Sequence, residues 1–325
     1  MITSASNTQV KNIIQLNQKA KARREQGLFV AEGRKMFGEA PRDWISKVYV
    51  TESLTSDSSL MEQISMLPEG KAEIVADHVF RQMCDTKTPQ GILTVLRKPV
   101  WTIQDILRGD SPLIMILEDL QDPGNAGTIF RTGEGAGVSG VFLTKTCVDI
   151  TNPKVIRSTM GSVYRMPFLY VEDVVSLKVE LKQKGIRTFA AHLKGKNSYD
   201  QENYQGGTAF LIGNEGNGLT EEAAEAADCL IRIPMCGKVE SLNAAMAAGI
   251  LMYEAARQRR EKGGVLWNQS YGWEFWQCFW SLKGLLRRLL PSGLPAAHWQ
   301  LPLHLVLELE LCLSFFCFLV FLLCF

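Results

Sequence analysis

Short apolar runs recur through the second half of the chain, and each is followed by a segment of different patterning. The runs cover residues 113–117, 141–143, 188–191, 209–212 and 230–233. Runs of this length are typical of buried strands. Helical spacing predicts helices from about residue 126, near 174–184, near 221–227 and over about 241–260. Such alternation indicates an α/β fold, with a mostly parallel sheet covered by helices.

The first hundred residues predict a separate α/β unit. Residues 10–24 have helical spacing, and three apolar runs predict strands at 28–30, 48–50 and 92–96. Residues 101–108 are predicted to link the two units. They precede Ser111-Pro112, a dipeptide that is typical of an element boundary. The predicted organisation is therefore one domain over residues 1–107 and a second over residues 108–262.

Residues 263–325 differ in composition from the rest of the chain. They end in an uncharged apolar run over 311–325. A spanning helix needs about 20 apolar residues, and extending this run upstream meets Glu308 and Glu310, which are costly inside a bilayer. Membrane contact is therefore disfavoured. We interpret the segment as an atypical extension of unknown role, for instance the product of a shifted reading frame.

Charge and cysteine content narrow the class of protein. The net charge of +1 gives no global positive field of the kind that many nucleic-acid binders have. Residues 19–24 nevertheless form a local basic run, which by itself predicts either a solvated helix face or a contact surface. The eight Cys lack CxxC spacing, which argues against a zinc site and a disulfide framework. We therefore expect no metal, and a reduced, cytoplasmic protein.

Three polar, glycine-rich segments follow predicted strands, and together they carry five side chains suited to chemistry. These are Asn125, Arg131, Glu215, Ser241 and Asn243. Open α/β sheets bind ligands at the carboxyl ends of their strands. The sequence therefore predicts that the three segments assemble into a single site.

The surroundings of these residues suggest how each would act. Asn125 and Arg131 lie in the first turns of a predicted helix, whose free N–H groups can hold a phosphate that the Arg then contacts. The glycines around Glu215 permit close approach of a ligand to the backbone. Ser241 is placed where helix caps occur. Asn243 is expected inside the helix, where its side chain would need a buried partner.

One glycine pattern suggests a different cofactor. Residues 135–140 match G-x-G-x-x-G, which in dinucleotide-binding proteins follows a strand and opens a helix. Here a predicted helix precedes the pattern and a strand follows it, so we interpret it as a helix C-cap and tight turn. A nicotinamide-dependent enzyme is the weakest of the alternatives. The four His form no cluster, and no Ser/His/Asp or Cys/His arrangement is evident.

Taken together, the three segments resemble the motifs of SpoU-type RNA 2′-O-methyltransferases, members of the SPOUT superfamily. The matching residues are Asn125, Gly127 and Arg131, then Gly213, Glu215, Gly216 and Gly218, then Ile233-Pro234-Met235 with Ser241-Leu242-Asn243. The first domain is similar to the L30e-like substrate-binding domain of that family, through Ile2-Thr3-Ser4, the basic run 19–24 and Gly27-Leu28-Phe29. Departures from the pattern occur at Glu240 and at Ala244-Ala245.

The resemblance implies a complete functional hypothesis. The second domain would contain a deep trefoil knot and form a homodimer. Its loops would bind S-adenosylmethionine through Gly213, Ile233 and Leu242. Arg131, Asn125, Glu215, Ser241 and Asn243 would serve catalysis, and the basic run would contact RNA.

The expected reaction is methyl transfer to a ribose 2′-OH, with 23S-type ribosomal RNA as the favoured substrate because of the added RNA-binding domain. The alternatives are a transfer RNA substrate and a non-catalytic, RNA-binding ribosome assembly factor of the same fold.

Overall fold

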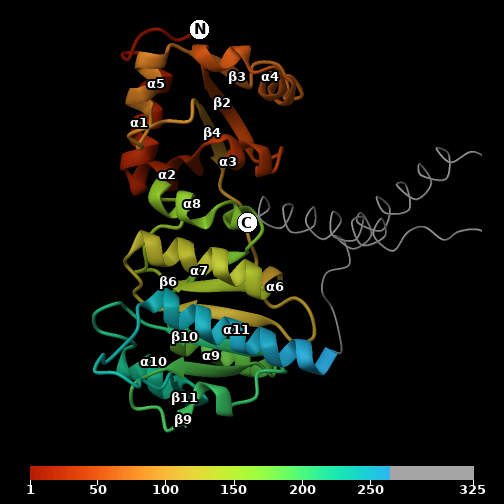
Figure 1. Ribbon diagram of the computed structural model, residues 1–325, viewed down its shortest axis with the longest axis vertical. Helices are drawn as coiled ribbons and strands as arrows, with labels where there is room; N and C mark the ends of the chain where they lie inside the picture. The colour runs from red at the N-terminus through yellow and green to blue at the C-terminus, as the bar shows by residue number, and fades with distance from the viewer. Residues whose placement is uncertain (264–325) are drawn as a thin grey trace, which may run out of the picture. The chain divides into compact units, whose positions relative to one another are not determined.

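Two β-sheets organise the chain in the computed structural model, which describes residues 1–263 (Figure 1). The predicted extension 263–325 lies outside the described residues apart from Gly263. The first sheet has four strands in the order β1-β4-β2-β3. Strand β4 is antiparallel to both β1 and β2, and β3 is parallel to β2. The strands are β1 (Leu28–Glu32), β2 (Ile45–Thr51), β3 (Ala72–Val75) and β4 (Ile92–Arg97).

Helices cover both faces of this sheet. Successive side chains of its strands point to opposite faces, so each face contributes to a separate apolar core. Phe29 and Ala31 belong to the same core as residues of α3 and α4. Val30 belongs to the opposite core, with residues of α1 and α5. The helices of this part are α1 (Thr8–Gln18), α2 (Ala20–Gln26), α3 (Arg34–Glu39), η1 (Glu52–Ser56), α4 (Ser58–Ser65) and α5 (Asp77–Met83).

The predicted single helix over residues 10–24 is wrong, because it is broken into α1 and α2. Lys19 between them has an extended backbone, with φ −118° and ψ 112°. The guanidinium of Arg23 donates hydrogen bonds to the carbonyls of Leu16 and Asn17 at the end of α1. These carbonyls therefore find a side-chain partner where the helix ends. Strand β3 was also missed, since it is only four residues long and contains the polar Glu73.

The second sheet has seven strands, and every pairing within it is parallel. This confirms the parallel α/β sheet that the alternating pattern predicted. The order along the sheet is β7-β6-β5-β10-β8-β11-β9. The strands are β5 (Leu113–Leu117), β6 (Gly140–Thr144), β7 (Phe168–Val171), β8 (Arg187–Ala191), β9 (Asn197–Ser198), β10 (Thr208–Ile212) and β11 (Cys229–Arg232).

Helices also cover both faces of the second sheet. One core joins the sheet to α7, α8 and α11, and the other joins it to α6, α9 and α10. The helices of this part are α6 (Ile103–Ile106), α7 (Pro123–Ala136), α8 (Pro153–Thr159), η2 (Ser162–Tyr164), α9 (Val174–Gln183), η3 (Tyr199–Gln201), α10 (Glu221–Ala226) and α11 (Ala244–Gly263). Sequence patterning missed the short elements α6, α8, β7 and β9, whose few residues carry little periodicity.

Strand order positions the candidate site. The chain builds the sheet outward in one direction from β5 through β6 to β7, and the later strands all lie on the other side of β5, with β10 next to it. The carboxyl ends of β5 and β10 therefore lie side by side where the strand order reverses. This is the position at which open α/β sheets bind ligands.

The glycine pattern at residues 135–140 has the predicted structural role. Helix α7 ends at Gly137, which has a left-handed φ of 81°, and β6 begins at Gly140. The interpretation as a helix C-cap and turn is thus confirmed, and no strand precedes the pattern as a dinucleotide fingerprint requires.

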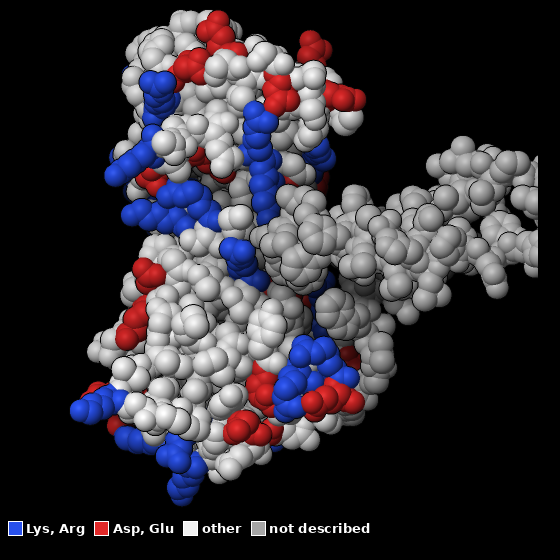
Figure 2. Space-filling view, viewed as in Figure 1, with Lys and Arg blue, Asp and Glu red and all other residues white. Residues whose placement is uncertain are grey.

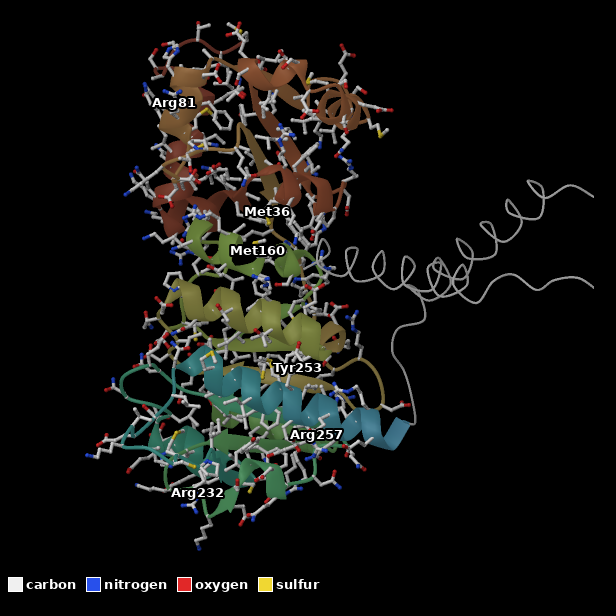
Figure 3. All side chains as sticks on the ribbon, viewed as in Figure 1. Met36, Arg81, Met160, Arg232, Tyr253 and Arg257 are labelled. Atoms are coloured by element: carbon white, nitrogen blue, oxygen red, sulfur yellow. The ribbon has the colours of Figure 1, made fainter. Side chains whose placement is uncertain are left out.

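The two sheets share one apolar core across α8, which contacts both β1 and α7. Met36 of α3 and Met160 beyond α8 mark this junction in Figure 3. Here the Tyr164 hydroxyl donates a hydrogen bond to the Met36 carbonyl at 3.1 Å. The predicted link packs on the second sheet, where its Ile106, in α6, is fully buried. Within residues 1–263, no helix has the length and apolarity needed to cross a membrane.

We predict that Gly127→Ala destabilises the fold because α7 and α8 approach closely at this glycine. An added Cβ would lie 2.2 Å from the Ser158 Cβ and 2.9 Å from the Val155 carbonyl oxygen. Overpacking of this kind costs about 1–3 kcal/mol. Gly38→Ala in α3 is the matched control, since nothing lies within 4 Å of its added Cβ. Urea unfolding should show a clear loss for Gly127→Ala only, and equal stability of the two variants would contradict the packing argument.

Candidate active site

Three hydrogen-bond donors at the start of α7 converge on the carboxylate of Glu215. Its Oε2 accepts from the Gln121 N–H at 3.2 Å, and its Oε1 accepts from the Asp122 N–H and the Asn125 Nδ2, both at 3.0 Å. Asp122 is the N-cap of α7 and accepts from the Asn125 N–H at 2.7 Å. A helix N-terminus stabilises negative charge. The loop after β10 is therefore held to the loop after β5 by a charge-assisted contact.

The sequence predicts that the start of α7 can hold a phosphate, and the chain itself places a carboxylate beside it. Asp122 binds the Asn125 N–H, and Glu215 binds the N–H groups of Gln121 and Asp122, which precede the helix. The loop carrying Glu215 folds over the helix end and supplies a carboxylate from within the chain. The anion at this helix N-terminus is thus part of the protein.

The side-chain amide of Asn125 extends the contact to the third loop. Its Nδ2 donates to Glu215, and its Oδ1 accepts from the Nδ2 of Asn243 at 2.9 Å. The Oδ1 of Asn243 accepts from the N–H groups of Ala245 and Met246, at 2.9 and 3.2 Å. Asn243 therefore caps α11, which begins at Ala244. The expectation that it lies inside a helix starting at residue 241 is wrong, although the expected polar partner exists.

The glycine-rich loop after β10 is closed by its own backbone. A Cβ on Gly213 would lie 2.1 Å from the Gly218 carbonyl carbon, so a side chain at position 213 would prevent the closure. Asn214 and Gly218 exchange backbone hydrogen bonds of 2.9 and 3.0 Å. The Asn214 Nδ2 also donates to the Asp119 carbonyl at 2.8 Å. Asp119 has a left-handed φ of 52°, which few residue types other than Gly tolerate.

Asn214 and Asp119 are site residues that the sequence analysis did not single out. Each lies two residues beyond the end of a predicted buried strand, and this position is the signal that could have identified it. Their hydrogen bond joins the same two loops that Glu215 joins. The β5 and β10 loops are thus fixed to each other at several points.

A cavity of about 560 Å³ opens beside this network, at the carboxyl edge of the sheet. It is formed by the segments after β8, β10 and β11 and by the start of α11. Gly213, Ile233 and Leu242 all line it, as the expected cofactor residues, together with Glu215 and Ser241. Further lining residues include Ala191, His192, Leu193, Leu219, Arg232, Pro234, Met235, Glu240, Ala244 and Ala247.

The predicted residues therefore fall into three groups. Asn125, Glu215 and Asn243 hold the loops together, and of these three only Glu215 also lines the cavity. Ser241 is exposed at the edge of the cavity and, among residues 1–263, has no hydrogen-bond partner for its hydroxyl. Arg131 lies farther along α7, exposed, and its guanidinium pairs with no carboxylate in the described part of the chain. This cation is available to a negatively charged ligand.

A second cavity, of about 490 Å³, lies at the opposite edge of the sheet, where Leu113 begins β5. Its charged residues include Arg165 and Glu134, which pair with each other. Parallel sheets bind ligands at the carboxyl edge, so we assign the site to the first cavity. No group of three metal-ligating side chains occurs within the described range 1–263.

Partial burial acts to raise the pKa of the Glu215 carboxyl, but hydrogen bonds outweigh it and the pKa is lowered. The donors are the Asn125 amide and the N–H groups of Asp122, Glu215 itself and Gln121. A carboxyl with a lowered folded-state pKa stabilises the fold above its unfolded pKa, and this contribution is lost as the pH falls through the folded value.

We therefore predict a pH-dependent stability difference between the native chain and Glu215→Gln. The native chain should be the more stable at neutral pH, and the difference should shrink below the ordinary glutamate pKa of about 4.3. Urea unfolding across this range measures it. Glu180→Gln, at an exposed position of α9, is the control and should give a small difference throughout. A difference for Glu215→Gln that does not change with pH would contradict the assigned role of the charge.

Comparison with known proteins places this geometry in a family. The SpoU rRNA Methylase family matches residues 112–253, and the MRM3-like substrate binding domain matches residues 7–94. The 23S rRNA (guanosine(2553)-2′-O)-methyltransferase RlmP of Bacillus subtilis is 31% identical over 253 residues, covering 78% of this chain and 97% of that protein. The human mitochondrial rRNA methyltransferase 3 is 30% identical, covering 73% of this chain and 69% of its own length.

Solved structures agree with the sequence relatives. The AdoMet-bound rRNA methyltransferase from Sinorhizobium meliloti superposes with a TM-score of 0.69 at 30% identity. The match covers 79% of this chain and 97% of that structure. The segments that carry Asn125, Glu215 and Asn243 lie within the matched range 112–253. From the parallel sheet, the three joined loops and these relatives, we conclude that the chain belongs to the SpoU rRNA methylase family.

Proposed function

We propose that this protein transfers a methyl group from S-adenosylmethionine to a ribose 2′-OH of RNA, and that its substrate is ribosomal RNA of the 23S type. The observation that carries the proposal is the Glu215–Asn125–Asn243 network. It joins three loops at the carboxyl edge of the sheet, beside a cavity, in a member of the SpoU rRNA methylase family.

The cavity suits S-adenosylmethionine in size and in chemistry. Its volume of about 560 Å³ lies in the range of small-molecule sites. Ile233 and Leu242 offer apolar contacts for an adenine ring, and the Glu240 carboxylate can face a positively charged group. Gly213, Ile233 and Leu242 would bind the cofactor mainly through their backbone. S-adenosylmethionine, when bound, supplies a methyl group on a sulfonium that leaves as a neutral thioether.

Arg131 is the residue assigned to the RNA in this proposal. Its guanidinium would bind the phosphate beside the target ribose and stabilise the negative charge that develops on the 2′ oxygen. The new O–C bond forms as the C–S bond breaks, and the hydroxyl proton passes to an RNA phosphate or to water. Arg131 itself stays protonated, because arginine does not lose its proton in proteins.

The other assigned residues act by holding the reactants in place. Asn125, Glu215 and Asn243 fix the relative positions of the three loops, and so hold the cofactor cavity in a fixed place relative to the start of α7. Positioning two reactants in this way accounts for a large part of many enzymatic rates. Ser241 would contact the cofactor or the ribose from the edge of the cavity.

The N-terminal part is proposed to bind the RNA. Figure 2 shows Lys and Arg side chains gathered at the level of α2. Lys19, Lys21 and Arg24 are exposed there and can reach phosphates, whereas Arg23 is buried and cannot. We propose two domains. Residues 1–107 would have an L30e-like fold, and residues 108–262 would contain a deep trefoil knot. The names of the relatives support an RNA substrate.

We further infer that the enzyme is a homodimer in the cytoplasm. Met246 and Tyr253 of α11 are 60% and 49% exposed, and Figure 3 labels Tyr253 on this helix. Exposed apolar residues that share a helix face favour contact with another protein surface. A second subunit placed there would cover both side chains.

We predict that Arg131→Ala abolishes methyl transfer while leaving cofactor binding intact. Loss of a group that stabilises developing oxyanion charge costs about a hundredfold or more in kcat. Transfer from labelled S-adenosylmethionine to bulk ribosomal RNA measures the rate, and calorimetric titration measures cofactor affinity. Arg131→Lys should retain only a small part of the activity, because lysine lacks the planar fork. Lys182→Ala removes an exposed cation of α9 and should have little effect.

The same assay separates the alternatives. Label in ribosomal RNA that disappears in Arg131→Ala supports the proposed reaction. Label only in bulk transfer RNA would keep the chemistry and overturn the substrate. Full activity of Arg131→Ala would overturn the assignment of this residue.

A further inference from the structure

Arg23 differs from its neighbours in the basic run because its side chain faces inward. Only 2% of the residue is exposed. Its Nη1 donates to the carbonyls of Leu16 and Asn17 at the end of α1, at 2.7 and 3.3 Å. Its Nε donates to the Asp149 Oδ2 at 2.9 Å, and its Nη2 lies 2.8 Å from the same oxygen. One guanidinium thus ties the N-terminal helices to the part of the chain that carries the second sheet.

Asp149 is itself held in a fixed geometry. It lies in segment 145–152, which connects β6 to α8, and its Oδ1 accepts from the N–H and the hydroxyl of Thr151 at 2.9 and 2.6 Å. Burial acts to raise the pKa of Asp149, but the Thr151 hydrogen bonds and the charges of Lys98 and Arg23 lower it. The ion pair with Arg23 is therefore formed between two charged groups at neutral pH.

Segment 145–152 also supports the loop that leads into α7. The Val148 N–H donates to the Leu120 carbonyl at 2.8 Å. The Cys147 Sγ accepts from the Leu120 N–H at 3.3 Å, and the Gln121 Nε2 donates to the Thr146 carbonyl at 2.7 Å. Leu120 is thus fixed through both of its backbone groups. The next two residues, Gln121 and Asp122, provide the N–H groups that bind Glu215.

We propose that Arg23 is a positioning residue, which clamps the RNA-binding part onto segment 145–152 and so sets where the target ribose meets the catalytic loops. The inference rests on the proposed function. Its physical basis is a short chain of contacts from Arg23 through Asp149 and segment 145–152 to Leu120 and the Glu215 carboxylate.

Two other ion pairs cross the same junction, and they differ from this one in burial. Arg157 pairs with Asp85 at 3.0 Å and Arg165 with Glu39 at 2.8 Å, and all four side chains are about one-third to one-half exposed. Exposed pairs contribute little. The side chain of Arg23 is 3% exposed and that of Asp149 is 24% exposed. Removing one partner of a pair so largely enclosed leaves a charge uncompensated and is more disruptive. Arginine is needed at position 23 because its fork serves two helix carbonyls and a carboxylate together.

The test compares Arg23→Met, Arg23→Lys and Asp149→Asn in the full-length chain. We expect cofactor affinity and the KM for ribosomal RNA to change little in Arg23→Met, and kcat to fall about 10- to 100-fold, as for a reactant displaced by about 1 Å. Asp149→Asn should give a similar loss, and the double variant should add little, because the two residues act as one unit. Arg23→Lys should recover part of kcat. Asp85→Asn is the control, and it should stay within about twofold of the native rate.

A second readout does not depend on activity. Amide hydrogen exchange at Leu120, Gln121 and Asp122 should become faster in Arg23→Met and Arg23→Lys, because the support behind this loop is loosened. Unchanged kcat with only a lower melting temperature, or unchanged exchange at these amides, would overturn the inference. If the native chain transfers no methyl group to any RNA, the proposed function fails, while the exchange measurement still decides whether Arg23 is coupled to the loop.

Discussion

The site depends on one electrostatic interaction, the Glu215 carboxylate bound at the N-terminus of α7. Two backbone N–H groups and the Asn125 amide donate to it. A helix end presents unpaired donors and a partial positive charge, so the carboxylate satisfies both at once. Because Asn125 also accepts from Asn243, the same contact sets the start of α11. The loops that follow three different strands are thereby held together at one edge of the sheet.

The joined loops have two functional parts beside them. The first is the cavity, which is lined by the loops after β10 and β11. Arg131 is exposed farther along α7 and remains available to an anion. Behind the same loops, segment 145–152 connects Leu120 to Asp149 and Arg23. The proposed methyl transfer to RNA draws on three features, which are the small-molecule cavity, the available cation and the fixed link to the basic N-terminal part.

Sequence patterning predicted the elements whose formation depends on burial of apolar residues. It missed the hydrogen bonds and ion pairs between particular polar groups. The apolar runs located β5 and β10 because buried strands must be apolar. The pattern could not show that Glu215 occupies the helix end for which a phosphate was expected. Nor could it show that Asn243 caps α11, because the apolar spacing predicted a helix that already begins at residue 241 and so includes Asn243. Arg23 was grouped with exposed cations, because a run of charges does not reveal which member faces inward.

The most direct test of the central claim is the chemical identity of the methylated product. Ribosomal RNA labelled by the full-length protein would be digested with alkali and the products separated. A 2′-O-methyl group removes the hydroxyl that alkali needs for cleavage, so the account predicts label in alkali-resistant dinucleotides. Label in ordinary mononucleotides would place the methyl group on a base and contradict the account.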